Sequence, residues 1–481
     1  MTSSSSNSIS DQPIVLETHK RLSESITWEI LRDYHSKRGV SAFEVVPYKV
    51  TNNCLFVSMM TDLLLASMND HEEIIDTQYV QQILELGSGS GCFGFRLMSH
   101  LERKKNWFEK FKNLKVKYSM TDFAASNVEA WRIHPAMQPL VEAGLIEFDT
   151  LNINTELDKK VTQNHNPIIV IGNYLIDDLH HDGFFVENGK VLECLYSAQY
   201  SCSQDDAEKL PKPGNLSWNI RNVEITEDSF ADKTVYAVLK SYEDQDGFGF
   251  ALPVGAFRLI QQLRQLTDEN FVFIGADWGS TTLWSKTPIT PTIHGGETGS
   301  LSVSVNFDAL KKYVTLIGGN CEIAEVFGLK IFVITMIKNS RRQDHVMFEL
   351  HERIAAENPP GLFSFMCEMI ASSPEQIPVV GLLVRCLKSC HYEPEILLLF
   401  VDRFFDRLIQ AIEKLNAADA VILNEVLAKV LQNVYSVSGV SIDSTLTSDP
   451  AANLIKVWKA AQTANFAQDA RNTIVRNAYA N

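Results

Sequence analysis

The sequence predicts an α/β fold with a doubly wound parallel sheet, a β insertion and a C-terminal all-α domain, and three observations support this. Between residues 81 and 174, short β-branched runs alternate with amphipathic segments, an order typical of a parallel sheet with right-handed crossovers. Between about residues 184 and 250 the runs become hairpin-like, and Asn188–Gly189 is a strong two-residue turn signal. From about residue 345 onward, apolar residues recur at helical spacing.

Composition and charge narrow the class of function. The chain has 481 residues, too many for one ordinary core, and its 45% hydrophobic content is enough to bury two or three domains. The formal net charge of −16 argues against a nucleic-acid partner, because phosphate binding requires a basic surface. The eight cysteines include no C-x-x-C pair, which indicates ordinary thiols in a reduced cytosol. A protein or a small molecule is therefore the expected ligand.

The N-terminal residues predict a disordered leader over 1–24. The stretch "MTSSSSNSISDQ" is polar, and the first basic residue is Lys20, so it resembles neither a secretory signal nor a transit peptide. No apolar run approaches the roughly 18 to 20 residues that a membrane span requires. We therefore expect a cytoplasmic protein without a membrane partner.

The next two segments predict a helical lid and then the α/β domain. Residues 25–80 form the lid, since apolar residues recur there at helical spacing until Pro47 and Asn52–Asn53 interrupt the pattern. Residues 81–340 form the α/β domain. Its predicted strands are residues 81–86, 116–122, 145–151, 166–174 and 271–277, with helices at 91–101 and 126–134 between them.

Three later segments complete the predicted organisation. The β insertion spans 184–250, with strand-like runs at 183–197, 217–226 and 234–242. Residues 321–337 contain two strands joined by a few residues around Gly328, and a parallel pair cannot be joined so tightly, so we expect an antiparallel hairpin at the sheet edge. Residues 345–481 form a helical, repeat-like or bundle domain. Its apolar stripes lie at 362–370, 378–389, 396–411 and 421–435.

The stretch "ILELGSGSGCFGF" behind the first strand contains two overlapping cofactor motifs. One motif is the G-x-G-x-x-G of a dinucleotide site, formed by Gly89, Gly91 and Gly94. The other is the E-x-G-x-G-x-G loop of S-adenosylmethionine enzymes, formed by Glu85, Gly87, Gly89 and Gly91. In a dinucleotide fold the first glycine ends the strand, but here Gly87 ends it and Gly89 comes two residues late. The S-adenosylmethionine motif is therefore favoured, with a glycine loop of no cofactor function as a third interpretation.

Carboxylates and amides at the ends of later strands extend the candidate site. Asp122 ends the second strand, where it could accept both ribose hydroxyls or simply cap a helix. Asp149 follows the third strand and is a weaker candidate for the adenine amino group. After the fourth strand come Asn173 and Tyr174, where the methyl acceptor would meet the cofactor, and then the pair Asp177–Asp178. Two adjacent carboxylates could orient a cationic acceptor such as a guanidinium.

These segments resemble one known family. The glycine loop, "TDFAASNVEAWRIHP", "VEAGLIEFDTLN", "NPIIVIGNYLIDDL" and "ALPVGAFRLIQQL", in this order, look like MidA-like class I methyltransferases. The resemblance covers about residues 26 to 340. It implies a Rossmann-like, seven-stranded methyltransferase sheet, S-adenosyl-L-methionine as cofactor, and methylation of a protein arginine. Two departures are Tyr174, where the family usually has glutamate, and Ile176-Asp177-Asp178, where it has an aromatic residue, aspartate and alanine.

The resulting hypothesis is an S-adenosylmethionine-dependent methyltransferase that acts on a protein side chain, with arginine favoured. The helical domain would bind the protein substrate or an assembly partner, and no metal site is expected because His180 and His181 lack partners at ligand spacing. Two alternatives remain: a non-catalytic assembly protein that retains the cofactor fold, and an NAD-binding oxidoreductase. The candidate catalytic residues are Asn173, Tyr174, Asp177 and Asp178. The candidate cofactor-binding residues are Thr51, Asn52, Glu85, Gly87, Ser88, Gly89, Gly91, Asp122, Phe123, Asp149 and Asn173.

Overall fold

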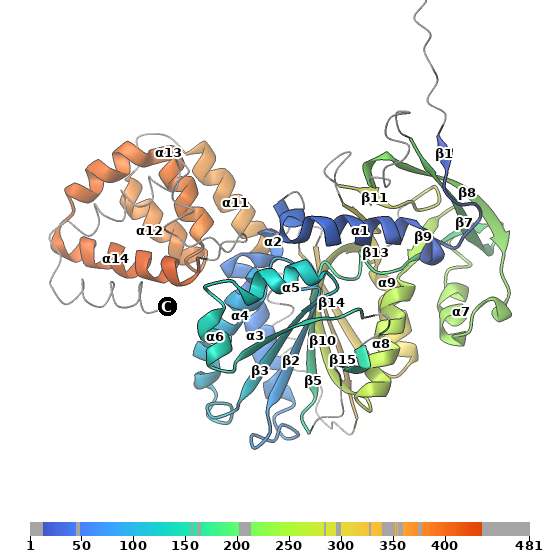
Figure 1. Ribbon diagram of the computed structural model, residues 1–481, viewed down its shortest axis with the longest axis horizontal. Helices are drawn as coiled ribbons and strands as arrows, with labels where there is room; N and C mark the ends of the chain where they lie inside the picture. Colours follow the sequence, from blue (N-terminus) through green and yellow to red (C-terminus); the bar gives the residue numbers. More distant parts are fainter. Residues whose placement is uncertain are drawn as a thin grey trace, which may run out of the picture.

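A twisted central sheet organises the chain in the computed structural model (Figure 1). The structure describes residues 13–434 apart from 45–48, 154, 156, 160, 162–164, 202–212, 283–284, 295–299, 327–328, 339–351, 353, 355–358 and 374–377. From one edge to the other, the strands run β14 (Asn320–Val326), β15 (Leu329–Ile337), β10 (Asn270–Ser280), β5 (Ile168–Asn173), β2 (Gln81–Leu86), β3 (Val116–Asp122) and β4 (Ile146–Thr150). Short β13 (Val305–Asn306) pairs with the end of β10.

One strand of this sheet is reversed. The pairs of β10 with β5, β5 with β2, β2 with β3 and β3 with β4 are all parallel. β15 is antiparallel to both of its neighbours, β10 and β14. The predicted hairpin is therefore confirmed, with β14 at the edge, although Gly328 itself lies outside the described residues.

Both faces of the middle of the sheet are buried, because successive side chains of β2, β5 and β10 enter different cores. Ile83, Ile169 and Val272 belong to the core under α3 (Cys54–Asp70) and α4 (Cys92–Lys104). Their neighbours Leu84, Val170 and Phe273 belong to the core under helices of the opposite face. The remaining helices of the α/β part are α5 (Ala125–Arg132), α6 (Gln138–Glu142), α7 (Lys233–Lys240), α8 (Val254–Leu266) and α9 (Phe307–Leu316).

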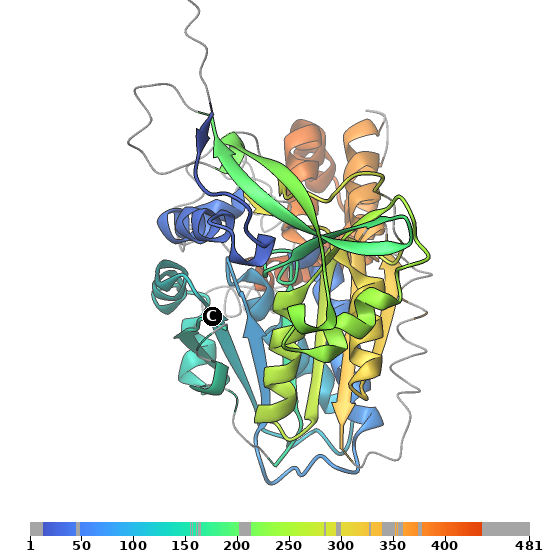
Figure 2. The same cartoon turned by 90° about the vertical axis from the view of Figure 1, so that its right-hand side faces the viewer.

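A second, antiparallel sheet forms the predicted β insertion, and Figure 2 shows it crossing above one end of the central sheet. Its members are β6 (Asp182–Glu187), β7 (Lys190–Tyr200), β8 (Leu216–Glu224), β9 (Gly249–Leu252) and β1 (Ile14–Val15). Asn188 and Gly189 both have positive φ, 53° and 71°, as the predicted two-residue turn between β6 and β7 requires. A separate pair joins β11 (Thr292–Ile293) to β12 (Leu301–Ser302).

The prediction of a strand over 234–242 is wrong. Most of this run belongs to the helix α7. Its β-branched residues favour a strand, but Val235, Val238 and Leu239 are spaced so that one helical face is buried. Asp232 supplies a helix start, because its side chain accepts a hydrogen bond from the Thr234 backbone N–H at 2.8 Å. Tertiary burial of one face thus outweighs the local β propensity.

The segment before the first central strand contains more structure than a leader and a lid. Within the range expected as a leader, Ile14–Val15 pair with β7 and Leu22–Glu24 form a 3₁₀ turn, while residues 1–12 lie outside the described residues. Next come α1 (Thr27–Arg38), the 3₁₀ segment Gly39–Glu44 and α2 (Lys49–Asn52). Figure 1 shows α1 crossing above the central sheet.

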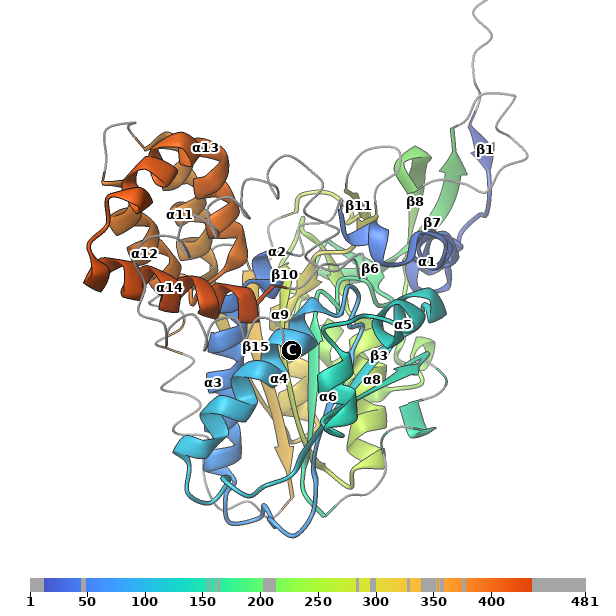
Figure 3. The same cartoon turned by 60° about the vertical axis from the view of Figure 1, so that its left-hand side comes forward.

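The C-terminal helices have a core of their own. They are α11 (Pro359–Ser372), α12 (Val379–Ser389), α13 (Pro394–Glu413) and α14 (Ala417–Gln432). Leu383, Phe400, Leu408 and Leu423 are fully buried among them. In Figure 3 this helical domain stands beside α3 and α4, and α11 contacts α2 and α3. The repeat-like arrangement of the domain stays a prediction, and residues from 435 onward lie outside the described part. No helix in the described ranges is long and apolar enough to span a bilayer.

Candidate functional site

A cavity of about 220 Å³ lies where the carboxyl ends of β2, β3, β5 and β10 meet the covering helix α1. Such an edge is where ligands bind in open α/β sheets. Of the candidate residues, those that line it are Thr51, Asn52, Glu85, Gly87, Ser88, Gly89, Asp122, Phe123, Asn173, Tyr174, Asp177 and Asp178. Gly91 and Asp149 do not line it. Gly91 instead begins α4 with a φ of 80°, and the Asp149 side chain accepts from the Thr150 backbone N–H.

The glycine loop follows the strand in the arrangement that the S-adenosylmethionine motif requires. β2 ends at Leu86, so Gly87 is the first residue after the strand, with a φ of 68°. Gly89 has a φ of 52°, and a Cβ there would lie 2.6 Å from Cζ of Phe43. Both conformations favour glycine. The dinucleotide motif, which begins at Gly89, does not fit the strand end.

Two buried carboxylates flank this loop. Oε2 of Glu85 accepts a hydrogen bond from the Ser88 hydroxyl at 2.8 Å. Burial raises the pKa of Glu85 to about 7, although the hydrogen bond from Ser88 opposes the shift. Asp122 accepts from the backbone N–H groups of Gly89 at 3.0 Å and Ala124 at 2.9 Å, and burial raises its pKa as well. Both carboxylates line the cavity, so a cationic or hydroxyl-bearing ligand would be matched on this side.

The other side of the cavity carries unsatisfied polar groups after β5. Among the described residues, both polar side-chain atoms of Asn173 and the Oδ1 atom of Asp177 are buried without a hydrogen-bond partner. Tyr174 has a φ of 48°, unusual for a non-glycine residue, and its N–H donates to the Ala276 carbonyl at 2.8 Å. Because buried polar groups are normally paired, these atoms indicate a ligand position.

A residue that the sequence analysis missed holds this segment. Asp277, fully buried near the end of β10 and just before Trp278, accepts hydrogen bonds from the backbone N–H groups of Ile176 at 2.7 Å and Asp177 at 3.2 Å. Burial raises the pKa of Asp177 to about 6. The pKa of Asp277 is raised well above its ordinary value, mainly by burial and also by repulsion from Asp177. Burial and repulsion from Asp177 likewise raise the pKa of Asp178. Three crowded carboxyl groups therefore share this side.

The covering residues were also missed. Trp28, Leu31 and His35 line the cavity from one face of α1, and Phe43 lines it from the following 3₁₀ segment. Burial lowers the pKa of His35 to about 4, so this histidine is neutral near pH 7. Other such lining residues are Arg32, Phe93, Asn127, Leu151, Asn152, Ile153, Leu175, Leu179, His180, Trp278, His294, Ser300 and Ser302. The helical spacing of apolar residues in α1 indicated that one face of the helix is buried, but it did not indicate that this face covers the cavity.

The histidines and carboxylates of the described ranges are dispersed with respect to metal-ligand geometry. These ranges contain no group of three or more histidine, cysteine, aspartate or glutamate side chains that could hold an ion. His180 lies beside a guanidinium of Arg258 at 3.2 Å, and Nδ1 of His181 is 2.9 Å from the Leu179 carbonyl oxygen.

The strand order decides the fold type. A parallel sheet with its last strand, β15, reversed and inserted between β10 and β14 is what distinguishes methyltransferase sheets from dinucleotide-binding ones. The fold is that of a Rossmann-like methyltransferase.

Comparisons with known proteins give remote structural likeness. No family model and no curated protein matches the chain. Among solved structures, a protein from Burkholderia thailandensis bound to S-adenosyl-homocysteine is similar at 10% identity and a TM-score of 0.45, over 67% of this chain and 89% of that one. The complex of DhpI with SAH is similar at 11% identity and a TM-score of 0.29, over 64% and 97%. The DszA carbon methyltransferase is similar at 8% identity and a TM-score of 0.30, over 58% and 53%. At such scores, the assignment of the site depends on the cavity residues themselves.

Proposed function

We propose that the protein is an S-adenosylmethionine-dependent methyltransferase that acts on a protein side chain, with arginine as the favoured acceptor. The observation that carries the proposal is one cavity with two chemically different sides. The glycine loop, Glu85 and Asp122 come from β2 and β3 and form the first side, and Asn173, Asp177 and Asp178 come from the end of β5 and the residues after it and form the second. A methyl donor and a cationic acceptor would meet between them.

The first side fits the proposed cofactor. Glu85 is 4% exposed, and its carboxylate accepts a hydrogen bond from the neutral Ser88 hydroxyl, so its charge is available to a ligand ammonium group. Asp122 has the two oxygens that a ribose diol requires. Gly87 has no side chain to obstruct the approach of a ligand to the loop backbone.

The second side fits a guanidinium acceptor. When bound, S-adenosylmethionine would supply the methyl group: a bond from the acceptor nitrogen to the methyl carbon would form in line as the carbon–sulfur bond breaks, and S-adenosylhomocysteine would leave. Asp177 and Asp178 orient the guanidinium, and Asn173 offers an amide oxygen to an N–H. Asp177 accepts the proton that the nitrogen loses. Its raised pKa of about 6 suits this role, because a general base is most effective when its pKa lies near the working pH. Positioning supplies most of the acceleration.

The pH dependence of cofactor affinity follows from Glu85. With a pKa of about 7, this carboxyl is protonated below pH 7, whereas pairing with an ammonium group requires the ionised form. Binding must then expel a proton, so affinity should fall by up to about tenfold per pH unit below 7 and stay level above it. Calorimetry across this range, in two buffers of different ionisation enthalpy, measures the proton release. Glu85→Gln should remove the dependence, and an unchanged profile would contradict the role of Glu85.

The choice between cofactors has a direct test. S-adenosylhomocysteine should raise the unfolding temperature while NAD leaves it unchanged, because only a ligand that binds the native state stabilises it. A shift with NAD alone would favour the oxidoreductase alternative. Binding of S-adenosylhomocysteine without any methyl transfer would favour the assembly-protein alternative, for which Tyr174 in place of the family's glutamate is the supporting observation.

The helical domain is proposed to bind the protein acceptor or an assembly partner. Leu362 and Phe365, three residues apart on α11, are 37% and 59% exposed, and such neighbours form one apolar face. Contact between this face and a protein acceptor would add to the affinity that the cavity provides. The corresponding measurement is the KM for a protein acceptor compared with that for a short peptide containing the same methylated residue.

A further inference from the structure

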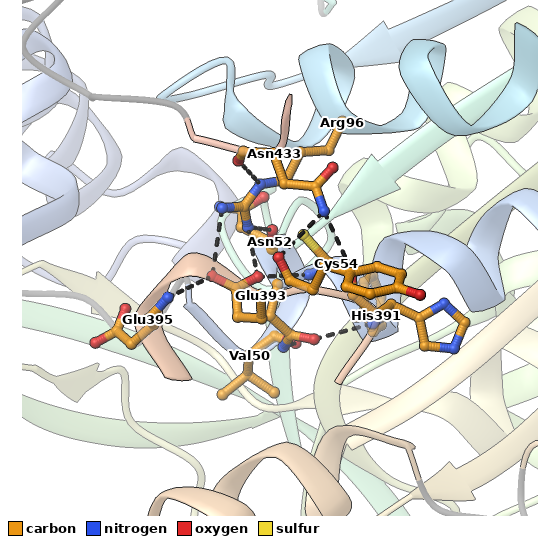
Figure 4. Close-up of polar contacts among 11 residues, drawn as sticks. Val50, Asn52, Cys54, Arg96, His391, Glu393, Glu395 and Asn433 are labelled. Carbon is orange, nitrogen blue, oxygen red and sulfur yellow. Dashed lines mark hydrogen bonds and ion pairs between the residues drawn. The ribbon is translucent and has the colours of Figure 1, made fainter. Parts of the chain in front are cut away.

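A buried ion pair joins the helical domain to the part of the α/β domain that carries the cofactor loop (Figure 4). Glu393 stands immediately before α13, and Arg96 lies on α4, which begins directly after the glycine loop. The guanidinium reaches both carboxylate oxygens, with Nη1 3.0 Å from Oε2 and Nη2 3.3 Å from Oε1. The exposed fractions of the two side chains are 8% and 5%. We call this contact and its neighbours Cys54 and Asn433 the Glu393 joint.

The carboxylate of Glu393 also serves two helix N-termini. Its Oε2 accepts from the Cys54 backbone N–H, the first of α3, at 2.7 Å, and its Oε1 accepts from the Glu395 N–H at the start of α13 at 3.3 Å. Helix N-termini favour negative charge. A neutral replacement would leave Arg96 buried without its counter-charge, and a shorter one would also leave the Cys54 amide unpaired.

The turn before Glu393 is held in a conformation that seldom occurs away from glycine. His391 and Tyr392 have φ values of 52° and 63°. The Asn433 side-chain amide donates to both of their carbonyl oxygens, at 3.1 and 3.2 Å, and the Asn433 carbonyl accepts from Nε of Arg96 at 3.2 Å. The end of α14 thus holds the turn and contacts Arg96. Strained backbone persists where the surroundings fix it, and such sites often have a function.

The same contacts reach the cavity. Thr51 and Asn52 line the cavity and precede Cys54 closely in the chain. Arg96 donates to the Asn52 carbonyl at 2.5 Å, so the ion pair holds this segment from two sides. Phe93, another lining residue, lies one helical turn before Arg96 on α4.

We propose that Glu393 is a positioning residue for the cofactor site, through which docking of the helical domain sets cofactor affinity. The inference rests on the proposed function, since it assigns S-adenosylmethionine to the cavity. Glu393 fixes the Asn52–Cys54 backbone, and this backbone presents Thr51 and Asn52 to the ligand. Coupling between two sites is reciprocal, so a bound cofactor strengthens the docking of the helical domain to the same degree.

The test compares full-length variants by calorimetry with S-adenosylhomocysteine. Glu393→Ala should raise its dissociation constant about tenfold or more, within the usual range of coupling between sites. Glu393→Gln, which keeps an acceptor for the Cys54 amide, should have a smaller effect. Asn433→Ala, which keeps the ion pair but frees the turn, should fall between wild type and Glu393→Ala. In methyl transfer, the KM for S-adenosylmethionine should rise while kcat changes by less than about twofold.

Two controls separate positioning from general stability. Glu425→Gln changes an exposed carboxylate on α14, and Leu408→Ala opens the core of the helical domain away from the joint. Leu408→Ala should lower the unfolding temperature while the dissociation constant stays within about twofold of wild type. Amide hydrogen exchange at Cys54 should speed up in Glu393→Ala and remain slow in both controls.

The outcomes distinguish this inference from the function on which it rests. If wild type fails to bind S-adenosylhomocysteine, the cofactor assignment is overturned and the coupling with it. If wild type binds and every folded Glu393 variant binds equally well, the joint is a structural contact alone and the positioning role is wrong. If Leu408→Ala weakens binding as much as Glu393→Ala, the effect is one of general stability, which also overturns the inference.

Discussion

Replacement of Asp177 by asparagine is expected to lower methyl transfer by about 10²- to 10⁴-fold, the usual contribution of a positioned general base. Asparagine keeps the shape of the side chain but can neither accept the proton nor pair with a guanidinium. Cofactor affinity should hold, because Glu85 and Asp122 lie on β2 and β3, whereas Asp177 follows β5. In wild type, the rate should also fall as pH drops through about 6, where Asp177 becomes protonated. The measurement is radiolabelled transfer from S-adenosylmethionine to lysate proteins, with mass spectrometry of the labelled residue.

Asp182→Asn is the matched control for this variant. Asp182 is also a buried carboxyl whose pKa burial raises, but it accepts from the Ser23 backbone N–H and does not line the cavity. Its replacement should leave the rate per folded molecule near that of wild type. Equal labelling by the wild-type and Asp177→Asn proteins would refute the role of Asp177, and label on a small molecule or a carboxylate would refute the arginine acceptor.

Gly89→Val is expected to abolish measurable cofactor binding while the central sheet remains folded. The residue has a φ of 52°, and a left-handed backbone costs a residue with a side chain roughly 1–2 kcal/mol of stability. The new Cβ would lie 2.6 Å from the Phe43 ring, so either the loop or the covering segment must move. Either movement changes the surface against which the ligand packs. Calorimetry with S-adenosylhomocysteine measures the loss.

Gly318→Val provides the matched control. Gly318 also has a positive φ, 91°, but nothing lies within 4 Å of a Cβ there, and it is not among the residues that line the cavity. The variant should show a comparable loss of stability with unchanged affinity. A folded Gly89→Val protein that binds as tightly as wild type would mean that the glycine loop is not the cofactor site.

The central strands could be predicted closely from the sequence. β2 and β3 have the bounds expected for them, because each places large apolar side chains in a short run that stops at a residue that favours a turn, Gly87 after β2 and Asp122 as the last residue of β3. The reversed strand could be predicted because a short connection permits only antiparallel pairing. Segment 234–242 was mistaken because its β-branched residues fit either structure locally, and the burial of one face decides between them.

The candidate site was predictable to the extent that its residues follow strands. Glu85, Asp122 and Asn173 come at strand ends, and parallel strands bring these ends to one edge. Asp277 is the last residue of the strand predicted over 271–277, so the same reasoning applied there would have found it, although β10 itself continues to Ser280. Trp28, His35 and Phe43 could not be found this way, because their place over the cavity depends on how a distant helix packs.

The composition of the sequence changes near residue 345, where the helical domain is expected to begin. The contact of Arg96 with Glu393 joins residues from both sides of this boundary. A chain shortened to end before Glu393 would remove the anion and the cover of Arg96 together, so a guanidinium at the root of the glycine loop would face solvent. The α3 N-terminus would lose an acceptor at the same time. An isolated α/β domain would therefore present a charged surface where the full chain has a buried, paired one. An engineered replacement of the helical domain is expected to need a carboxylate at the position of Glu393 to pair with Arg96.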